Sequence, residues 1–256
     1  MSTDPNLPVI LVTGAARGIG RAVASWFAED GCAVVALDVD DQVSALQDQP
    51  GGQIVPFVGD VSDPVVVDRV VAETVDRYGR LDVLVANAGI GGGAPVAELT
   101  DEQFRRILDV NLFGVFACCR AAARVMIPRR SGRIITVGSI FGQDPPGGSA
   151  AYAASKAGVA ALTISLSREL GPHGITVNCV SPGHIETDMY AAALQRRATL
   201  RGVSLEEITQ RELDPIALGR FGTPDDVAAV VQFLASPAAA YVTGQRINVD
   251  GGIQPR

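Results

Sequence analysis

A tyrosine and a lysine stand one helical turn apart in the segment Tyr-Ala-Ala-Ser-Lys, at Tyr152 and Lys156. The surrounding residues favour a helix, so both side chains project from one face. A phenol is a poor base at neutral pH because its ordinary pKa is about 10, but a neighbouring ammonium group favours the phenolate. The pair is therefore suited to remove a proton from a substrate hydroxyl. The same spacing also occurs in purely structural pairs, so other residues must support the assignment.

A serine precedes this pair along the chain. Ser139 directly follows the apolar run RIITVG, which predicts a strand. Open α/β sheets bind ligands at the carboxyl ends of their strands. The hydroxyl of Ser139 is suited to hold the oxygen of an alcohol or a carbonyl, so Ser139 and Tyr152 are the candidate substrate contacts.

A glycine-rich turn lies near the N-terminus, where the run TGAARGIG joins a first apolar strand to a helix. Glycines allow a tight turn and let backbone N–H groups approach a phosphate, and the helix N-terminus adds partial positive charge. The spacing GxxxGxG differs from the common GxGxxG, and a plain helix-entry loop is the alternative. Its place in the first βαβ unit favours a dinucleotide site. The expected cofactor contacts in this turn are Thr13, Gly14, Arg17, Gly18, Ile19 and Gly20.

Asp38 ends the second predicted strand in the run VVALDVDD. A carboxylate there accepts hydrogen bonds from the adenosine ribose hydroxyls of NAD. It would repel the 2′-phosphate of NADP by about 4 kcal/mol at a separation of about 4 Å and an intermediate dielectric. Arg17 acts in the opposite direction, because a guanidinium can bind that phosphate. We expect Asp38 to dominate, which makes NAD the cofactor and NADP the less favoured one; a loop-capping role for Asp38 is the alternative.

The elements that must position these residues alternate along the chain. Apolar runs rich in Val and Ile predict seven strands, at 8–13, 33–37, 53–58, 82–86, 133–137, 176–180 and 246–249. Helical patterns lie between them, at 18–30, 64–78, 101–127, 150–170 and 224–234. This alternation predicts an α/β fold in a single domain over residues 1–256: a Rossmann-type, doubly wound, seven-stranded parallel sheet with helices on both faces.

One segment interrupts the alternation. Residues 186–218 show no strand signal, two short helical patterns and the charged run LQRRATLRG. Because this segment follows the sixth strand, it should lie where open α/β sheets bind ligands. We expect a substrate lid; a solvated surface excursion is the alternative.

Composition restricts the functional class. The net charge of -7 argues against a nucleic-acid partner, which requires clustered Lys and Arg, and two histidines are too few for a multi-histidine metal site. The four cysteines stand in apolar runs without zinc or CxxC spacing, which predicts buried thiols in a reducing compartment. The N-terminus lacks a signal-peptide pattern, and no uninterrupted apolar stretch reaches the length of about 18 residues that spans a bilayer. We therefore expect a cytoplasmic protein without a membrane contact or a bound metal.

Together these residues resemble the short-chain dehydrogenase/reductase (SDR) family, in its single-domain branch of roughly 250 residues. The resemblance covers essentially the whole chain, and its motifs occur in one order: TGAARGIG, Asp60-Val61, Asn87-Ala88-Gly89, Asn111, Ser139, Tyr152/Lys156, Pro182-Gly183 and VDGG. One departure is Ala86, since the family often has a second asparagine there. That departure puts one structural contact in doubt and leaves the contact of Asn87 with the cofactor plausible.

The resemblance implies roles for further residues. Asn111, in the middle of a helix, would complete a catalytic tetrad with Ser139, Tyr152 and Lys156 by holding a water in a proton relay to the lysine. Lys156 would also hold the nicotinamide ribose. The implied cofactor contacts are Asp60 and Val61 at the adenine, Asn87, Ala88 and Gly89 after the fourth strand, Tyr152 and Lys156, and Pro182, Gly183, Ile185 and Thr187 at the nicotinamide.

The reaction implied by the resemblance is hydride transfer between NAD(H) and a secondary alcohol or ketone. The substrate alcohol would hydrogen-bond Ser139 and Tyr152, the tyrosinate would remove its proton, and hydride would pass to NAD⁺. The family also implies a homotetramer, in which the helices at 101–127 and 150–170 form one interface and the C-terminal strand another. The substrate pocket would be built from residues near 90–94, 140–146 and 186–218, which fit many secondary alcohols.

Two other functions stay open. Arg124, Arg129, Arg130 and Arg133 cluster where a long helix ends, where positive charge complements the helix dipole. The cluster would instead suit an acidic partner, as in NADPH-dependent 3-oxoacyl-(acyl-carrier-protein) reductases of the family. The second alternative is a non-catalytic NAD(H)-binding regulator, which the complete catalytic set disfavours. His184 follows the Pro-Gly motif, and we expect it to face solvent, with a substrate contact as the alternative.

Overall fold

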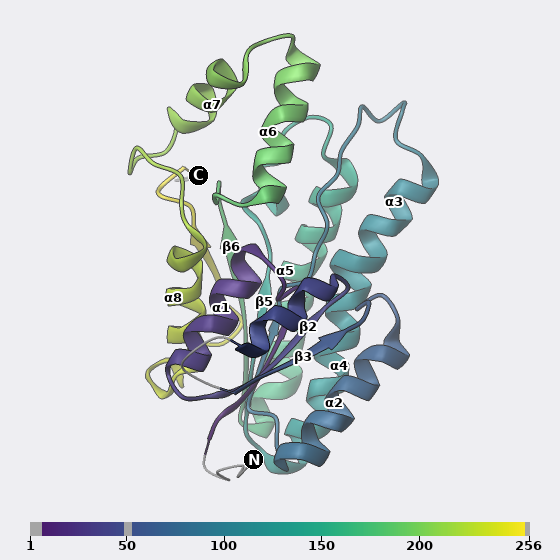
Figure 1. Cartoon of the computed structure of the whole chain (residues 1–256), viewed down its shortest axis with the longest axis vertical. Helices are drawn as coiled ribbons and strands as arrows, with labels where there is room; N and C mark the ends of the chain where they lie inside the picture. Colours follow the sequence, from purple (N-terminus) through teal and green to yellow (C-terminus); the bar gives the residue numbers. More distant parts are fainter. Residues whose placement is uncertain (1–6, 49–52, 254–256) are drawn as a thin grey trace.

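Seven parallel strands form one sheet in the order β3-β2-β1-β4-β5-β6-β7 (Figure 1). The computed structural model describes residues 7–48 and 53–253. Its strands are β1 Val9–Thr13, β2 Ala33–Asp38, β3 Gln53–Val58, β4 Val83–Ala86, β5 Gly132–Val137, β6 Ile175–Pro182 and β7 Arg246–Val249. The predicted doubly wound, seven-stranded parallel sheet is confirmed. The strand order changes direction between β1 and β4, and ligands bind at such a switch point in open α/β sheets.

The central strands are apolar along their whole length because both faces of the sheet are covered. Every residue of β1, β4 and β6 is buried. A strand that is buried on both faces has no reason to alternate apolar and polar residues, which is why these runs read as continuous. β6 is longer than the predicted strand at 176–180, so Pro182 is its last residue.

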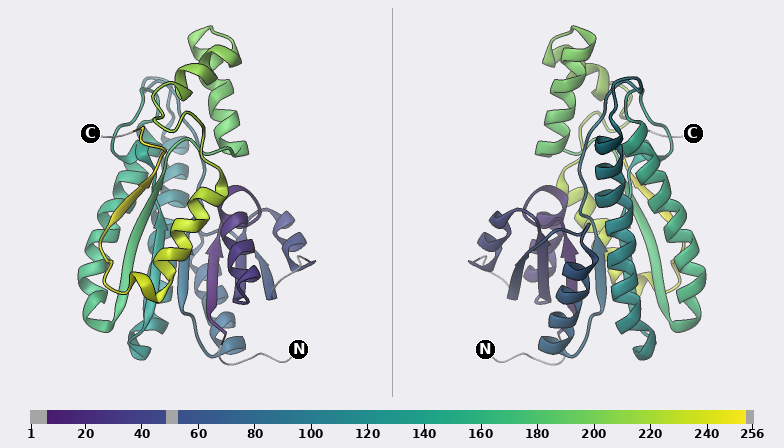
Figure 2. Two further views of the ribbon diagram at one scale, coloured as in Figure 1. Left: turned by 90° about the vertical axis from the view of Figure 1, so that its left-hand side faces the viewer. Right: turned by 90° about the vertical axis from the view of Figure 1, so that its right-hand side faces the viewer.

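Helices pack on the two faces in separate layers (Figure 2). One layer holds α1 Gly18–Glu29 and α8 Pro224–Ala235, together with the short helical turn Asp41–Asp48. The opposite layer holds α2 Pro64–Tyr78, α4 Val115–Arg129 and α5 Ala150–Leu170. Two hydrophobic cores result, one on each side of the sheet.

Local sequence signals explain several helix ends. The side chain of Asp63 accepts a hydrogen bond from the backbone N–H of Val65 at the start of α2, and Pro64 occupies the first helical position. Gly79 ends the same helix in a left-handed conformation, with φ of 71°. These are the residue types that favour helix starts and ends.

The predicted helix at 101–127 is a continuous helical segment that changes its geometry in the middle. It consists of α3 Asp101–Leu108, a π-helical turn Asp109–Gly114, and α4. By length and composition this segment would suffice to cross a membrane, but more than half of its apolar stretch is buried inside the protein, as in the core helix of a globular fold. The π-helical turn carries Asn111, and such turns are frequent at functional sites.

The segment 186–218 forms two helices above the carboxyl edge of the sheet, α6 Asp188–Arg201 and α7 Leu205–Leu213 (Figure 1). The absence of a regular strand in this segment was predicted. The helices share a small hydrophobic core formed by Leu194, Ala198 and Ile208. Side-chain oxygens of Thr187 and Ser204 cap the two helix N-termini.

A buried polar cluster joins this segment to the sheet. His184, which follows β6, places Nε2 3.3 Å from Oε2 of Glu212 in α7, and its Nδ1 lies 3.3 Å from the backbone oxygen of the same residue. Nη1 of Arg197 in α6 lies 2.9 Å from the same Glu212 carboxylate. Tyr190 stacks on the imidazole at a centroid separation of 5.0 Å.

The expectation that His184 faces solvent is therefore wrong, because only 6% of this residue is exposed. The two helices of the segment 186–218, α6 and α7, close over the imidazole and supply its partners, which the sequence did not indicate. Burial, followed by the nearby charge of Arg197, lowers the pKa of His184, although Glu212 acts in the opposite direction.

We expect acidification to destabilise the protein through His184. Above the ordinary histidine pKa of about 6.5 the residue is neutral in both the folded and the unfolded chain, so it contributes no pH dependence. As the pH falls below that value, the unfolded chain takes up a proton that the buried imidazole resists, and the free energy of unfolding decreases. Melting temperatures of the wild type and of His184→Asn, measured from about pH 7 to about pH 5, should show the steeper fall in the wild type.

The matched control is His173→Asn, which alters the only other histidine of the chain, at a partly exposed turn. It should keep the pH dependence of the wild type. A wild type that loses no more stability on acidification than His184→Asn would contradict the prediction.

Candidate active site

Two pockets adjoin at the carboxyl edge of the sheet. The first, the glycine-loop pocket, is lined by Gly14, Arg17, Gly18, Asp38, Asp60 and Val61 among others. The second, the tyrosine pocket, is lined by Ser139, Tyr152, Lys156, Gly183 and His184 among others. Both are lined by Ile19, Asn87, Gly89, Thr187 and Met189, so one elongated ligand can extend from one into the other.

The glycine turn after β1 forms a wall of the first pocket from backbone alone. Gly14 has φ of 67°, a left-handed conformation that side chains disfavour. A Cβ at Gly20 would overlap the carbonyl oxygen of Gly14, so only glycine allows α1 to approach the turn this closely. Arg17 precedes α1 without capping it through its side chain. The first-turn N–H groups of α1 are thus available to an anion, and this cradle fits the diphosphate of a dinucleotide.

Hydrogen bonds tie this turn to the end of β4. Oγ1 of Thr13 accepts from the backbone N–H groups of Asn87 at 3.1 Å and Ala88 at 3.0 Å. Nδ2 of Asn87 donates to the backbone oxygens of Thr13 at 2.8 Å and Gly14 at 3.1 Å. Thr13 and Gly20 therefore lie behind the pocket wall, and the amide N–H₂ of Asn87 holds the turn. Ala86 is buried in β4, and its departure from the family pattern leaves these contacts intact.

Asp38 lies at the rim of the glycine-loop pocket, at the end of β2. Its Oδ2 accepts from the N–H of Ala16 at 2.9 Å, and its Oδ1 accepts from the N–H of Asp40 at 2.9 Å. A carboxylate has about four lone-pair positions, so acceptor capacity remains for a ligand hydroxyl. Arg17 lies 3.7 Å from the carboxylate of Asp40, with two thirds of its side chain exposed. These two hydrogen bonds also hold the loop that follows β2, which agrees with the alternative prediction that Asp38 caps this loop.

Asp60 and Val61 line the same pocket after β3. Partial burial acts to raise the pKa of Asp60, but hydrogen bonds from Ser62 and Arg106 outweigh it and lower the pKa. Nη2 of Arg106 lies 3.0 Å from Oδ2 of Asp60. Arg106 was not predicted from the sequence, because no spacing links a residue of α3 to one that follows β3.

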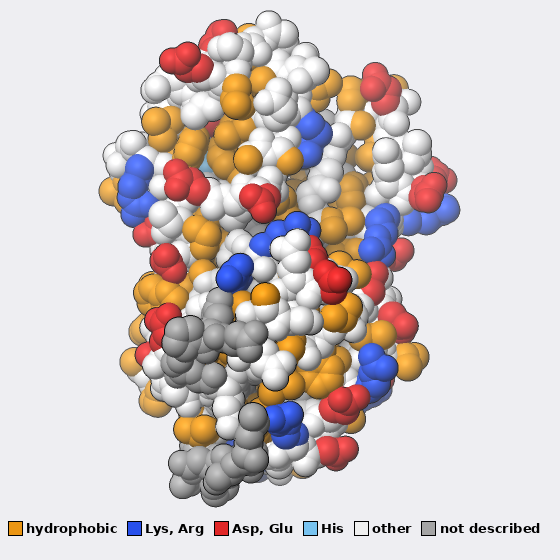
Figure 3. Space-filling view, viewed as in Figure 1, with side chains coloured by type: hydrophobic (Ala, Val, Ile, Leu, Met, Phe, Trp, Pro, Cys, Tyr) orange, Lys and Arg blue, Asp and Glu red, His pale blue; other side chains and the backbone are white. Residues whose placement is uncertain are grey.

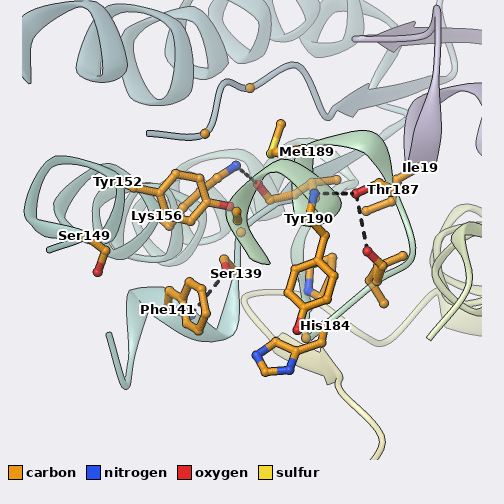
Figure 4. Close-up of a pocket in the computed structure, with 18 of the residues that line it drawn as sticks. Ile19, Ser139, Phe141, Ser149, Tyr152, Lys156, His184, Thr187, Met189 and Tyr190 are labelled. Atoms are coloured by element: carbon orange, nitrogen blue, oxygen red, sulfur yellow. Dashed lines mark hydrogen bonds between the residues drawn. The ribbon is translucent and has the colours of Figure 1, made fainter. Parts of the chain in front are cut away.

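Ser139 and Tyr152 meet in the tyrosine pocket (Figure 4). Ser139 follows β5 and caps a short helical turn, its Oγ accepting from the N–H of Phe141 at 3.2 Å. Tyr152 is in the first turn of α5, partly exposed to the pocket. Burial raises the pKa of Tyr152, while a hydrogen bond with Ser139 acts to lower it. The two hydroxyl groups thus form one polar centre in an otherwise apolar part of the pocket.

Lys156 lies one turn further along α5, beneath Tyr152. Its Nζ donates to the backbone oxygen of Val137 at 2.8 Å and lies 5.8 Å from the centre of the Tyr152 ring. Burial lowers the pKa of Lys156 to about 8. From the sequence, the ammonium group is expected to lower the pKa of the phenol. In this structure burial of the phenol dominates, and the pKa of Tyr152 is raised.

Asn111 is fully buried behind the junction of the two pockets. Its Oδ1 accepts from the N–H of Ile90 at 2.8 Å, and its Nδ2 donates to the oxygen of Ile90 at 3.0 Å. Nδ2 also lies 3.3 Å from Oγ of Ser155. A Cβ at Gly89 would lie 3.3 Å from Oδ1 of Asn111 and 3.5 Å from Nζ of Lys156, so the three residues form one cluster. Asn111 therefore holds the loop after β4 against Lys156; the water relay stays a prediction.

The segment after β6 forms the floor shared by the pockets. Gly183 donates its N–H to the oxygen of Val249 at 2.9 Å, and a Cβ there would lie 2.8 Å from Cα of Asp250. Ile185 is buried, whereas Thr187 is at the rim, where its Oγ1 accepts from the N–H of Tyr190 at 3.2 Å. Pro182, Gly183, Ile185 and Thr187 all line the tyrosine pocket, so the structure brings them together as expected.

The α6–α7 segment was expected at the site, but none of its side chains was predicted from the sequence. α6 turns Met189, Tyr190, Ala193, Arg196 and Arg197 toward the tyrosine pocket. These positions recur at the spacing of one helix face, a signal that was readable in the sequence. Tyr190, His184 and Phe141 form an aromatic wall opposite Tyr152 (Figure 4).

The four arginines at the end of α4 lie away from both pockets. They stand at the amino edge of the sheet, where β5 begins, whereas the pockets are at the carboxyl edge. Each is bound within the chain: Arg124 to Asp68 at 3.3 Å, Arg129 to Asp82 at 3.5 Å, Arg130 to the oxygen of Pro172 at 2.8 Å, and Arg133 to the oxygen of Ala235 at 2.9 Å.

Comparisons with known proteins agree with this site. The family model described as enoyl-(acyl carrier protein) reductase, which belongs to the SDR family, matches residues 14–254. The chain is 40% identical over 251 residues to the 3-oxoacyl-[acyl-carrier-protein] reductase of Synechocystis sp., covering 96% of each protein. It is also 40% identical over 274 residues to the cyclohexanol dehydrogenase of Rhodococcus sp., covering 97% of this chain and 98% of the relative.

A solved structure extends the likeness to three dimensions. A variant of actinorhodin polyketide ketoreductase, crystallised with NADPH, has a TM-score of 0.94 and 35% sequence identity, with full coverage of both chains. The glycine turn, the serine after β5 and the Tyr-Lys pair of α5 all lie at the carboxyl edge of one doubly wound sheet. The chain belongs to the short-chain dehydrogenase/reductase family of oxidoreductases.

Proposed function

We propose that this protein is an NAD-dependent dehydrogenase that interconverts a secondary alcohol and a ketone. The observation that carries the proposal is the meeting of the Ser139 and Tyr152 hydroxyls in a pocket that continues into the glycine-loop pocket. A substrate oxygen bound to these two hydroxyls would lie close to the floor formed by Gly183 and Ile185. That floor is where we place the nicotinamide end of the cofactor.

The chain's own residues would bind the substrate and move one proton. Ser139 holds the substrate oxygen, and Tyr152 removes the hydroxyl proton in oxidation or supplies it in reduction. Lys156 sits behind the phenol, and a pKa of about 8 lets it exchange protons near neutral pH. The nicotinamide cofactor, when bound, accepts or supplies the hydride. The aromatic wall and the α6 side chains exclude water from the reacting centre.

NAD is the cofactor that the rim of the glycine-loop pocket favours. Asp38 places a carboxylate there, and the charge of Arg17, which lines the same pocket, is offset by the neighbouring carboxylate of Asp40. A 2′-phosphate would meet net negative charge at this point, whereas ribose hydroxyls can donate to Asp38. The ketoreductase relative was crystallised with NADPH, so the cofactor choice of this chain is argued from the charges at its own pocket rim.

A second candidate substrate is a 3-oxoacyl group on an acyl carrier protein. Relatives with that activity in their names are 39–40% identical to this chain. The four arginines at the end of α4 do not supply a docking site beside the pocket, because they lie at the opposite edge of the sheet. Turnover of an acetoacetyl thioester compared with that of simple ketones distinguishes the two substrates.

Three further features complete the proposal. The α6–α7 segment acts as the substrate lid, since its side chains line the tyrosine pocket. A cytoplasmic location is supported by four cysteines that are all buried and unpaired in the described part of the chain. A homotetramer is supported by exposed apolar residues on the helices that the family uses for assembly: Phe113, Phe116 and Ile164.

Tyr152→Phe should abolish turnover and leave cofactor binding intact. The substitution removes the hydroxyl that transfers the proton and keeps the ring in place. We expect kcat to fall by about a hundredfold to ten-thousandfold, measured by NADH absorbance, while NADH binding measured by fluorescence stays unchanged. The control Tyr241→Phe alters a fully exposed tyrosine and should keep wild-type kcat. Near-normal turnover of Tyr152→Phe would refute the assignment.

Asp38→Asn should shift the cofactor preference toward NADP(H). The variant keeps one side-chain oxygen for the loop and removes the negative charge from the pocket rim. We expect the ratio of kcat/KM for NADPH to that for NADH to rise by about tenfold or more. The control Asp41→Asn lies three positions along the chain on an exposed turn and should leave the ratio unchanged. A wild type that already prefers NADPH would contradict the cofactor proposal.

Light scattering should give the mass of four chains for the wild type. Phe116→Asp places a charge on the exposed apolar face of α4 and should reduce the mass to that of a smaller assembly. The control Val65→Asp alters a residue on α2 that is 73% exposed and should leave the tetramer intact. A monomeric wild type would overturn the assembly proposal.

A further inference from the structure

The two pockets differ in the sign of their charged side chains. The glycine-loop pocket is lined by three acids, Asp38, Asp60 and Asp188, and by two arginines. The tyrosine pocket is lined by three cationic residues, Lys156, Arg196 and Arg197, and by no acid. The whole chain carries 28 acidic and 21 basic residues. The charged side chains that line this pocket are all cationic, so the local charge is opposite in sign to the net charge of the protein.

Two of the three cations are engaged within the protein. Lys156 is 4% exposed and donates to the oxygen of Val137. Arg197 binds the carboxylate of Glu212 at 2.9 Å, and its guanidinium lies 5.2 Å from the centre of the Phe141 ring. Glu212 itself lines a neighbouring pocket behind Phe141 and His184, so it does not face the tyrosine pocket. These contacts compensate the positive charge of Arg197, so Arg196 is the cation of this pocket whose charge is not yet accounted for.

Arg196 lies on the exposed side of α6 and lines the tyrosine pocket. The side chain of Arg196 makes no hydrogen bond or ion pair with any residue within 7–48 or 53–253. Met189, Ala193 and Arg196 follow one another at helical spacing along the wall, so the guanidinium extends an otherwise apolar face. Figure 3 shows the hollow below α6, with hydrophobic side chains along its walls.

We propose that Arg196 binds an anionic group of the substrate, which makes the substrate a ketone or alcohol that carries a carboxylate or phosphate away from the reacting carbon. Arg196 lies nine positions after Thr187, a rise of about 13 Å along α6. Ser139 follows β5 and Tyr152 belongs to α5, so an anion bound by α6 contacts a different wall of the pocket from the carbonyl. A guanidinium offers a planar pair of donors that suits both carboxylate and phosphate. This inference rests on the proposed alcohol–ketone activity and names its substrate class.

The test compares matched anionic and neutral substrates. Methyl-ketone acids, beginning with levulinate and lengthened by two and then four methylene groups, are assayed against their methyl esters. Acetoacetyl coenzyme A is assayed against the neutral acetoacetyl thioester of N-acetylcysteamine. For at least one anionic member the wild type should show a KM about tenfold below that of its neutral partner, a difference of about 1.4 kcal/mol. The pair that shows it, acid with ester or the two thioesters, identifies carboxylate or phosphate as the ligand.

Arg196→Gln should raise the KM for that anionic substrate to the value of its neutral partner, with kcat unchanged. The KM for the neutral partner should not change, which separates charge recognition from a general effect on the pocket. The matched control is Arg201→Gln, in the last turn of the same helix and lining neither pocket, which should behave as the wild type.

Two results would overturn the inference. One is a wild type that shows no preference for any anionic substrate over its neutral partner. The other is an Arg196→Gln variant that keeps the preference or loses both substrates equally. If neutral ketones are turned over by the wild type and not by Tyr152→Phe, the proposed function stands whichever of these results is obtained. Failure of that turnover in every pair would refute the proposed function itself.

Discussion

Both pockets depend on the junction between the ends of β1 and β4. Thr13 accepts two backbone N–H groups from the end of β4, and Asn87 returns two hydrogen bonds to the end of β1. These bonds hold the glycine turn in a conformation with little room for side chains at Gly14 or Gly20. The turn directs the N-terminus of α1 to one pocket, and the chain after Asn87 forms the passage to the other. The glycine-loop pocket is therefore a consequence of strand order together with four hydrogen bonds between the ends of β1 and β4.

The buried side chain of Asn111 provides a second support for the two pockets. Asn111 pairs both groups of its amide with the backbone of Ile90, and the same amide contacts Ser155 in the helix that carries the Tyr-Lys pair. A regular α-helix would carry the side chains after residue 108 in a different direction, so the π-helical turn sets where the amide points. The loop after β4 and the helix α5 are thus held by a single buried side chain. This explains how residues from three separate elements can reach one reacting centre.

Features with a local signal were predictable from the sequence, and features made by tertiary contact were not. Continuous apolar strands, the glycine turn and the Tyr-Lys spacing each follow from neighbouring residues, and the fold follows from their order. The π-helical turn has no such signal, because its neighbours favour an ordinary helix. His184 was expected at the surface because its burial depends on α6 and α7 closing above it. Arg106 was missed for the same reason, since only the folded chain brings it to Asp60.

Burial acts in opposite directions on the two titrating groups of α5. It raises the pKa of Tyr152, because a phenolate loses hydration, and it lowers the pKa of Lys156 to about 8, because an ammonium does too. The two pKa values, which are close together in water, therefore move apart, so that proton transfer from the lysine ammonium to a phenolate becomes favourable and the reverse transfer becomes more costly. Each unit of separation between the two pKa values corresponds to about 1.4 kcal/mol. Desolvation thus makes Tyr152 a weaker acid and Lys156 a stronger one. A positive charge added beside them would favour the phenolate without any movement of the chain.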